Sequence, residues 1–273
     1  MSHHELAGSS PDVSGPHALP RRRVGALEAV VATPQDAAHS IARFASEYHP
    51  DGLHVHLVNA YTVALADKDG EYRKVLSEDA LNFPDGKPLS WISKLRRDSP
   101  HLHQVRGPQF FLDVMNVGRQ FELKHYLLGS TTEVLERIRE NLESSYPGVN
   151  IVGAESPPFR PLSAEEIEAQ DGRVTESGAS IVWVGLGTPK QDRESARIAA
   201  ALPITAIAVG AAFDFAAGTL REAPAWMRAC GLEWLFRLSR EPRRLWRRYL
   251  FGNARFVRSV VLARSSSDVD ASR

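Results

Sequence analysis

The sequence predicts an α/β fold, with a Rossmann-like, open and mostly parallel sheet followed by a helical appendage rich in arginine and aromatic residues. Two observations predict the sheet: short apolar runs alternate with stretches of helical spacing, and several runs end in turns that carry glycine or asparagine. A third predicts the appendage, because after about Leu220 the strand-like runs stop and arginines and aromatic residues become dense. Ligands are expected outside the carboxyl ends of the strands of such a sheet.

The expected strands and helices follow one another along the chain in βαβ order. Strands are expected at residues 53–58, 81–84, 121–128, 149–152, 180–184 and 204–209. Helices are expected within 63–76 and at 89–95 and 110–117. A further helix follows the strand at 121–128 and ends near 145, another begins at Ser163, and the last follows the strand at 180–184 and ends near 201. Glu166 follows Ser163 at the spacing of a capping box. Pro189 is expected at the first position of the last helix, where its missing N–H costs nothing.

Four regions are expected along the chain. Residues 1–20 are rich in Ser, Pro, Gly and His and predict a disordered leader. The α/β catalytic core is expected at residues 21–218 and a helical, membrane-associating appendage at 219–262. Residues 263–273 predict a disordered tail.

The charge of the chain is divided unevenly. The 273 residues carry 33 Lys and Arg against 33 Asp and Glu, a net charge of zero. Thr219–Arg258 holds ten arginines against three glutamates, a net of +7, which leaves the rest at −7. The single cysteine, Cys230, excludes an intramolecular disulfide, and no apolar run reaches the roughly 18–20 residues of a membrane span. These observations predict a cytoplasmic protein with a locally basic working surface.

Two turns between a strand and a helix could hold a phosphate group. Gly129-Ser130 opens one helix, and the segment from Gly185 to Gly187 precedes the other. Glycine lets the backbone approach a ligand, and helix N-termini attract anions. Neither turn completes the dinucleotide fingerprint or the P-loop, so a nicotinamide-dependent oxidoreductase is the less favoured function. Ordinary tight turns remain the alternative.

Five blocks of the sequence carry a family resemblance. Gly185-Leu186-Gly187-Thr188-Pro189-Lys190-Gln191-Asp192 resembles the G-x-G-x-P-K-Q-E block of the bacterial TagA/WecG/CpsF glycosyltransferases, glycosyltransferase family 26. Residues 209–218 resemble their G-V-G-x-x-F-D-x-x-A-G block, and residues 231–249 resemble their L-E-W-L-[YF]-R-L…E-P-x-R…R-R-Y tail. Asn59-Ala60 and Pro84-Asp85-Gly86 are similar to the two N-terminal signatures, and all five blocks stand in the family's order.

The resemblance implies an inverting glycosyltransferase. Such an enzyme moves a sugar, typically N-acetylmannosamine, from a UDP-sugar to a polyprenyl-diphosphate-linked sugar in cell-surface polysaccharide or teichoic acid synthesis. It works at the inner face of the cell membrane as a peripheral protein and needs neither a metal nor a cofactor. The expected partners are the UDP-sugar, the lipid-linked acceptor and an anionic membrane surface, without nucleic acid, and a homo-oligomer is left open.

Asp85 is the expected catalytic base. An inverting transfer needs one group that takes the proton of the acceptor hydroxyl. Asp85 follows a strand at a turn, and it matches the aspartate proposed as the base in the family. The alternative is that Pro-Asp-Gly is turn chemistry alone. Asn59 and Gln191 are expected to bind substrate, with an N-cap role as the alternative for Asn59.

The remaining expected site residues bind the nucleotide and its phosphates. They are Gly129, Ser130, Gly185, Gly187, Lys190, Phe213, Asp214, Arg237, Arg244 and Arg247. The three arginines match the tail arginines that the family directs at the leaving diphosphate. Arginine suits that task because its guanidinium group is planar, bidentate and permanently charged. Basic and aromatic residues around them suit an interfacial helix on anionic lipid.

No metal site is expected. Asp67-Lys68-Asp69 has the Asp-x-Asp pattern of metal-dependent transferases, but we expect it on a surface helix, where the two carboxylates diverge. His54 and His56 share one face of a strand and could bind zinc. The favoured interpretation is that these two histidines bind no metal and make their hydrogen bonds within the protein or with solvent.

Four positions depart from the family pattern. Leu57 replaces a threonine, Gln104 and Gln109 replace an arginine and an aspartate, and Glu222 stands where the family has the arginine of R-A-P. These changes predict an altered sugar or acceptor. They also motivate an alternative function, a catalytically impaired module of the same family that binds nucleotide sugar without turnover.

Overall fold

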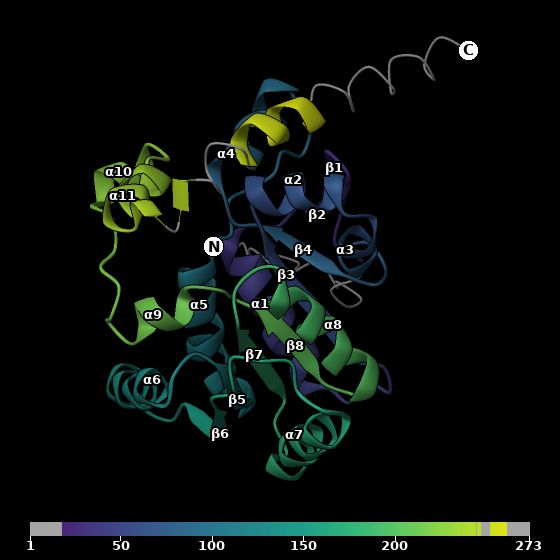
Figure 1. Ribbon diagram of the computed structural model, residues 1–273, viewed down its shortest axis with the longest axis vertical. Coiled ribbons are helices and arrows are strands. Elements are labelled where there is room, and N and C mark those ends of the chain that lie inside the picture. Colours follow the sequence, from purple (N-terminus) through teal and green to yellow (C-terminus); the bar gives the residue numbers. More distant parts are fainter. Residues whose placement is uncertain (1–17, 244, 247–251, 261–273) are drawn as a thin grey trace, which may run out of the picture.

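Six parallel strands form the central sheet of the computed structural model, which describes residues 18–243, 245–246 and 252–260. The strands are β3 (Leu53–Val58), β4 (Leu81–Pro84), β5 (Lys124–Gly129), β6 (Asn150–Glu155), β7 (Ile181–Gly185) and β8 (Thr205–Ala208). They lie in the order β4-β3-β8-β7-β5-β6, and each neighbouring pair is parallel (Figure 1). The predicted Rossmann-like fold class is therefore confirmed.

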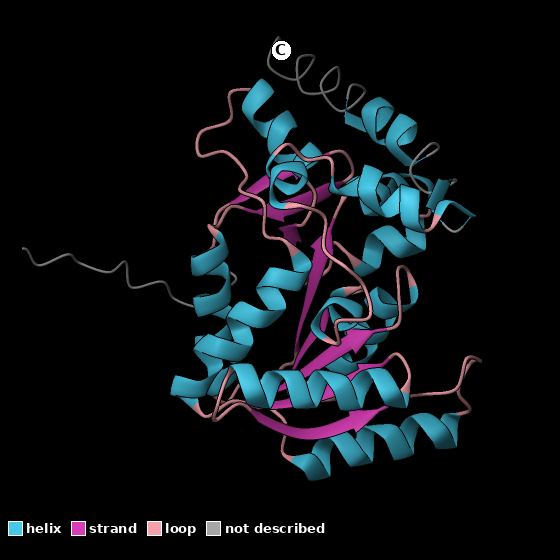
Figure 2. Ribbon diagram, turned by 90° about the vertical axis from the view of Figure 1, so that its left-hand side faces the viewer, coloured by secondary structure: helices cyan, strands magenta, loops and turns pink. Residues whose placement is uncertain are grey.

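Helices cover both faces of this sheet (Figure 2). They are α1 (Pro34–Ser46), α2 (Ala60–Lys68), α3 (Gly70–Val75), α4 (Lys87–Leu95), α5 (Gly107–Gly118), α6 (Thr132–Ser145), α7 (Ala164–Ser177), α8 (Lys190–Ala201), α9 (Ala212–Ala216), α10 (Ala225–Ala229) and α11 (Glu233–Arg240), with a 3-10 turn at Arg119–Phe121. Side chains alternate between the faces of a strand. On β7, Ile181 and Trp183 pack with residues of α1 and α5, whereas Val182 and Val184 pack with residues of α7 and α8.

A short hairpin and a helix precede the sheet and were not among the predicted elements. Strands β1 (Arg21–Val24) and β2 (Leu27–Val30) pair antiparallel, and Thr33 caps α1 by accepting from the Asp36 N–H. Three consecutive arginines in β1 hide the apolar alternation that would have predicted a strand. β2 supplies that alternation instead, because Leu27, Ala29 and Val30 are buried.

Several predicted boundaries need correction. β5 begins at Lys124 rather than 121, because a 3-10 turn extends α5 and Glu122 then adopts a left-handed φ of 54°. Pro189 is not the first helical residue; it occupies the N-cap position, and α8 starts at Lys190. The capping box at Ser163 is confirmed, with hydrogen bonds in both directions between Ser163 and Glu166.

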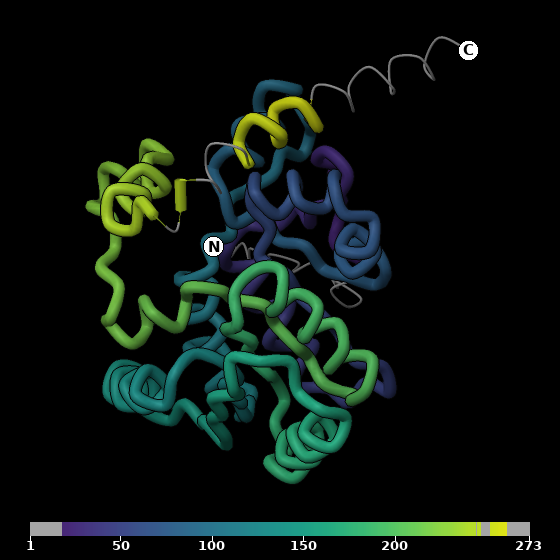
Figure 3. Tube along the Cα trace, in the orientation of Figure 1, coloured from purple at the N-terminus to yellow at the C-terminus, as the bar shows by residue number. Residues whose placement is uncertain are grey.

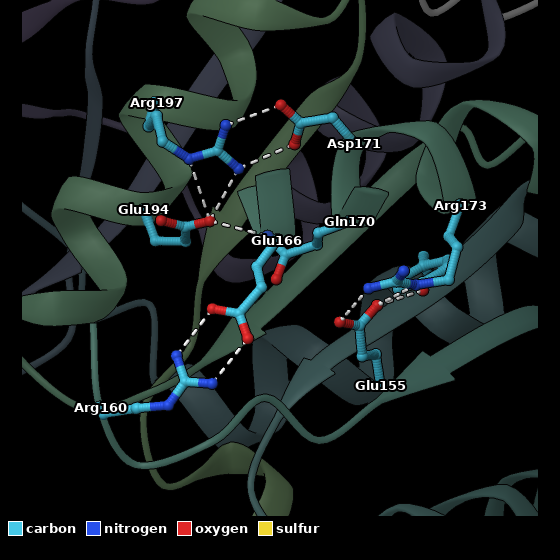
Figure 4. A network of polar contacts seen from close by, with 9 residues as sticks. Glu155, Arg160, Glu166, Gln170, Asp171, Arg173, Glu194 and Arg197 are labelled. Carbon is cyan, nitrogen blue, oxygen red and sulfur yellow. Dashed lines mark hydrogen bonds and ion pairs between the residues drawn. The ribbon is translucent and has the colours of Figure 1, made fainter. Parts of the chain in front are cut away.

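A polar network on the side of the sheet away from α5 joins α7 to its neighbours (Figure 4). Arg197 of α8 holds Asp171 of α7 with two hydrogen bonds of 2.8 Å, and Glu194 accepts from both Arg197 and Gln170. Arg173 and Glu155 link α7 to β6 in the same way. These contacts fix the layer of α7 and α8 against the sheet.

The chain leaves the core after α9 and continues into the helical C-terminal region (Figure 3). After α11, a helical segment at residues 252–260 packs back against the β1–β2 hairpin and α2, where Phe256 and Val260 are buried. Arg96 holds this segment through a hydrogen bond of 2.8 Å to the Val260 carbonyl. Leader residues 1–17, Arg244, Arg247 and the tail at 263–273 lie outside the described residues.

Candidate active site

The carboxyl ends of the strands bring most of the expected site residues to one edge of the sheet. Asp85 follows β4, Asn59 follows the adjacent β3, and Gly210 follows β8, the next strand across. Gln191 of α8 faces Gly210, since a Cβ atom at position 210 would lie 3.5 Å from the Gln191 side-chain amide. The sheet thus aligns the catalytic and substrate-binding candidates along neighbouring strands.

Asp85 is half-buried and firmly oriented. Its N–H donates to the Val58 carbonyl at 2.8 Å, and its Oδ1 accepts from the Gly107 N–H at the start of α5, also at 2.8 Å. Burial raises the pKa of Asp85 above its usual range, and the Glu233 carboxylate adds to that rise. The Gly107 N–H and the Arg106 and Arg237 guanidinium groups oppose it. A carboxyl group with a raised pKa is a competent proton acceptor near neutral pH.

Two arginines meet over one aromatic ring beside Asp85. The Cζ atoms of Arg106 and Arg237 lie 5.2 and 6.0 Å from the centre of the Phe215 ring. Arg106 also holds Glu233 in a bidentate ion pair, with its Nη2 2.8 Å from Glu233 Oε1. Among the described residues, the buried Arg237 Nε has no hydrogen-bond partner, so this guanidinium group has an unused donor.

Asn59 acts as the N-cap of α2. Its Oδ1 accepts from the N–H groups of Tyr61 and Thr62 at 3.0 and 3.3 Å. The carboxamide oxygen is therefore committed to the cap, and any contact with a sugar would come from the amide nitrogen. Asn59 still lines the edge, because a Cβ at Gly86 would lie 3.3 Å from the Asn59 Cβ.

Gln191 and Lys190 lie at the start of α8 with different environments. Gln191 is buried, and its Oε1 accepts from the Gly187 N–H at 3.0 Å, which ties the glycine turn to the helix. Lys190 is exposed at the first helical residue. Gln191 therefore shapes the turn, whereas Lys190 is the residue of this pair that solvent and a charged ligand can reach.

The two glycine turns lie side by side and are closely packed. Gly129 has a φ of 126°, and a Cβ there would lie 2.6 Å from the Gly185 carbonyl oxygen. Ser130 adopts a left-handed φ of 58°, and its carbonyl accepts from the Ser156 hydroxyl. A Cβ at Gly185 would lie 2.5 Å from the Phe213 ring. Both glycines are required by close backbone approach.

Phe213 and Asp214 occupy contrasting positions in α9. The Phe213 ring is buried beneath Gly185 and stacks edge-on against Phe111, with ring centres 5.8 Å apart. Phe213 thus supports the turn from inside the core rather than facing a nucleotide. Asp214 is half-buried, and its carbonyl accepts from the N–H groups of Thr219 and Leu220 where the chain leaves the core.

The four departures from the family pattern take distinct places. Leu57 lies beside the Asp85 turn, since a Cβ at Gly107 would meet both the Leu57 side chain and Asp85 Oδ1 at 3.8 and 3.7 Å. Gln104 donates to the Asp85 carbonyl, and Gln109 pairs with Asp113 on the exposed face of α5. Glu222 accepts from Arg106 at 2.8 Å. Three of the four therefore contact the surroundings of Asp85.

The two histidines of β3 belong to a buried polar chain. His54 Nδ1 lies 2.9 Å from His56 Nε2, His56 Nδ1 lies 3.0 Å from Asp192 Oδ1, and the Tyr72 hydroxyl donates to Asp192 Oδ2 at 2.7 Å. Asp67 lies in α2, whereas Asp69 caps α3. In the part of the chain that the structure describes, no group of three or more His, Cys, Asp or Glu side chains could hold a metal ion.

Sequence reasoning missed Arg106, Phe215 and Glu233 as site residues. Arg106 lies in a block that departs from the family pattern, so the resemblance assigned it no role. Its partners Glu222 and Glu233 follow more than a hundred residues later in the chain. One signal in the sequence could have indicated Arg106. It immediately precedes Gly107-Pro108, and a proline at this place is typical of the first turn of a helix. The contacts themselves depend on how the C-terminal region folds back.

Comparisons with known proteins identify the family of the chain. The model of the glycosyl transferase WecG/TagA/CpsF family matches residues 23–269. The N-acetylglucosaminyldiphosphoundecaprenol N-acetyl-beta-D-mannosaminyltransferase of Bacillus subtilis (strain 168) is 28% identical over 200 residues, covering 73% of this chain and 75% of the relative. Because the family model spans nearly the whole described structure, including the Asp85 edge and the arginine-rich region, the chain belongs to the WecG/TagA/CpsF family of glycosyltransferases.

Proposed function

We propose that the protein transfers an N-acetylmannosamine-like sugar or another hexose from a UDP-sugar to a polyprenyl-diphosphate-linked sugar, with inversion and without a metal. The observation that carries this proposal is the pairing of a half-buried, oriented carboxyl group with a cation. Asp85 has a raised pKa, and Arg237, whose Nε has no hydrogen-bond partner among the described residues, acts on it electrostatically. The relative from Bacillus subtilis, named for such a transfer, supports it.

The chemistry follows from those two groups. The acceptor hydroxyl attacks the anomeric carbon of the donor, its proton passes to Asp85, and the bond from that carbon to the diphosphate oxygen breaks. Attack and departure occur on opposite faces, which inverts the anomeric centre. In this proposal, Arg237 and the turns at Gly129 and Gly185 stabilise the negative charge that develops on the UDP.

An exposed apolar surface, here called the docking face, supports the proposal that the acceptor is linked to a lipid. It joins α4 to the appendage, because a Cβ at Gly231 would lie 2.5 Å from the Trp91 ring. Its exposed side chains are Trp91 (48%), Leu95 (80%), Trp226 (62%) and Leu235 (43%). Exposed cations on the same elements and just beyond them include Lys94, Arg97, Arg240 and Arg243. Aromatic, apolar and basic groups together suit the surface of an anionic bilayer.

This docking face supports a peripheral position at the inner face of the cell membrane. Among the described residues, no helix is long and apolar enough to cross a bilayer. A lipid-linked acceptor would then reach the Asp85 edge from the membrane, while the UDP-sugar arrives from the cytoplasm. Such an arrangement accounts for the positive charge of the C-terminal region.

The test is a panel of UDP-sugars with a synthetic lipid-diphosphate acceptor, measured as UDP release in the presence of chelator. We expect release that depends on both donor and acceptor. Asp85→Asn should abolish turnover while UDP binding, measured by thermal shift, persists. Asp67→Asn, at an exposed position of α2, is the matched control and should behave as the native protein. UDP binding without turnover in the native protein would instead establish a binding module.

A further inference from the structure

Arg106 is the centre of a contact set that joins the core to the appendage, here called the Arg106 junction (Arg106, Phe215, Glu222, Glu233 and Arg237). Arg106 contributes a bidentate pair with Glu233 and a second ion pair with Glu222, both at 2.8 Å. Its side chain is only 13% exposed, compared with 22% for Glu233 and 42% for Glu222. Charge-assisted, bidentate pairs of this kind fix geometry as well as energy.

The Arg106 junction is directly connected to Asp85. Arg106 is the N-cap residue of α5, and the next N–H in the chain, that of Gly107, is the donor to Asp85 Oδ1. A displacement of Arg106 therefore moves the hydrogen bond that orients the carboxyl group. Through space, Arg106 and Arg237 favour the charged carboxylate of Asp85, and Glu233 disfavours it. The hydrogen bond from Gly107 and the surrounding charges therefore both act on the Asp85 carboxyl group.

Two departures from the family pattern lie at Asp85 and in the Arg106 junction. The family arginine expected at position 104 is a glutamine here, and that glutamine donates to the Asp85 carbonyl. The family arginine of R-A-P is Glu222 here, and Glu222 is a partner of Arg106. Gln104 therefore contacts the Asp85 turn, and Glu222 contacts the arginine that precedes the donor to that carboxyl group.

We propose that Arg106 is a positioning residue for Asp85, and that it couples the docked state of α11 to the orientation and charge of that carboxyl group. This proposal rests on the proposed function. When Glu233 and Glu222 hold Arg106, Gly107 is fixed on Asp85 and the base is ready. When α11 moves away, Arg106 loses its bidentate partner Glu233, and the Asp85 hydrogen bond loses part of its anchor.

If Arg106 only linked the core to the appendage, without influence on Asp85, its variants would behave differently. Arg106→Gln and Glu233→Gln break the same ion pair, so a tether predicts the same defect from both. A positioning role predicts opposite shifts, because removing the cation raises the pKa of Asp85 and removing the anion lowers it. The charged groups that act on Asp85 among the described residues are Arg106, Arg237 and Glu233.

The experiment measures turnover against pH and, independently, the titration of the Asp85 carboxyl by carbon-13 NMR, assigned by difference with Asp85→Asn. We expect Arg106→Gln to lower kcat by about tenfold or more and to move the acidic limb of the profile to higher pH. Glu233→Gln should move it to lower pH. Arg106→Lys keeps the charge and should leave the limb near its native position. UDP affinity should change little in all three.

Arg119→Gln is the matched control, since Arg119 lies at the other end of α5 and bonds the Pro147 carbonyl. It should leave the profile unchanged. Shifts in the same direction for Arg106→Gln and Glu233→Gln, or no NMR shift in either, would overturn the proposal. The NMR titration also separates it from the proposed function: a native protein without turnover contradicts the function, whereas the carboxyl titration still reports on the Arg106 junction.

Discussion

The Gln104 side-chain amide donates a hydrogen bond of 2.6 Å to the backbone carbonyl of Asp85. Gln104 is half-buried, and it holds the backbone of the turn that follows β4, whereas the Gly107 N–H holds the Asp85 side chain. Gln104→Ala should destabilise the protein by about 1 kcal/mol and lower kcat several-fold without a matching change in the donor KM. Denaturant unfolding and steady-state kinetics measure the two effects.

Gln109→Ala is the control for that change, because Gln109 pairs with Asp113 on the outer face of α5. It removes the same kind of side chain at a distance from the turn, and both measurements should stay near native values. Equal losses of kcat in the two variants would contradict a role of Gln104 at the Asp85 turn.

Gly185→Ala and Gly172→Ala should have opposite effects on stability. A Cβ at Gly185 collides with the buried Phe213 ring, so we expect a loss of about 1–3 kcal/mol and weaker UDP binding. Gly172 lies in α7, where a Cβ would meet no atom within 4 Å beyond its own stretch of helix among the described residues, and alanine there should add about 0.5–1 kcal/mol. Thermal and denaturant unfolding give both values.

The collision has a direct check. Phe213→Leu leaves more room beside Gly185 and should therefore recover part of the loss when combined with Gly185→Ala. Additive losses in the double variant would show that Gly185 is required for a reason other than the Phe213 ring.

Acid should destabilise the protein through His125. This histidine is buried, its Nδ1 accepts from the Trp183 indole N–H at 3.2 Å, and burial lowers its pKa from 6.5 to about 3. In the unfolded chain His125 binds a proton below about pH 6.5, whereas in the folded chain it stays neutral down to about pH 3. The free energy of unfolding should therefore fall by roughly 1 kcal/mol per pH unit across that window.

His125→Asn tests this dependence, because asparagine can still accept from Trp183 but does not titrate. The variant should lose less stability between pH 6.5 and pH 4 than the native protein does, as followed by urea unfolding at each pH. His39→Asn changes an exposed histidine of α1 and should retain the native acid response. An unchanged slope in His125→Asn would remove His125 as the source.

The docking face should bind anionic vesicles. Leu95→Ser and Trp226→Ser each remove an exposed apolar side chain of this face and should lower cosedimentation with phosphatidylglycerol vesicles several-fold. Phe159→Ser is the matched control, since Phe159 is 92% exposed and lies on neither α4 nor the appendage. Added salt should weaken binding in every case. Equal loss in the control, or none in the two variants, would contradict the docking face.

The sequence predicted the sheet well because its six strands are short apolar runs with distinct turns. β1 was missed because its arginines leave no apolar period. The positions of Asp85, Asn59 and Gln191 at one edge followed from the rule that parallel strands share a carboxyl end. Phe213 was expected beside the nucleotide, and the structure places it in the core, because a motif does not say which face of a helix is buried.

Arg106 could not be predicted in the same way. Its partners depend on the path of the chain after α9, and neither residue spacing nor periodicity reports which arginine among many meets which glutamate. The same holds for the chain from His54 to Tyr72, whose middle bond joins residues 136 positions apart. Long-range polar pairs need the tertiary structure.

The place of β8 has a consequence for the synthesis of the protein. β8 is the last strand in the described part of the chain, yet it lies between β3 and β7 and joins β4-β3 to β7-β5-β6. Until Thr205–Ala208 has left the ribosome, a nascent chain holds two unjoined half-sheets, each with an open edge that can pair with another chain. Truncations before β8 should therefore aggregate, and stable folding should begin only after this strand has emerged.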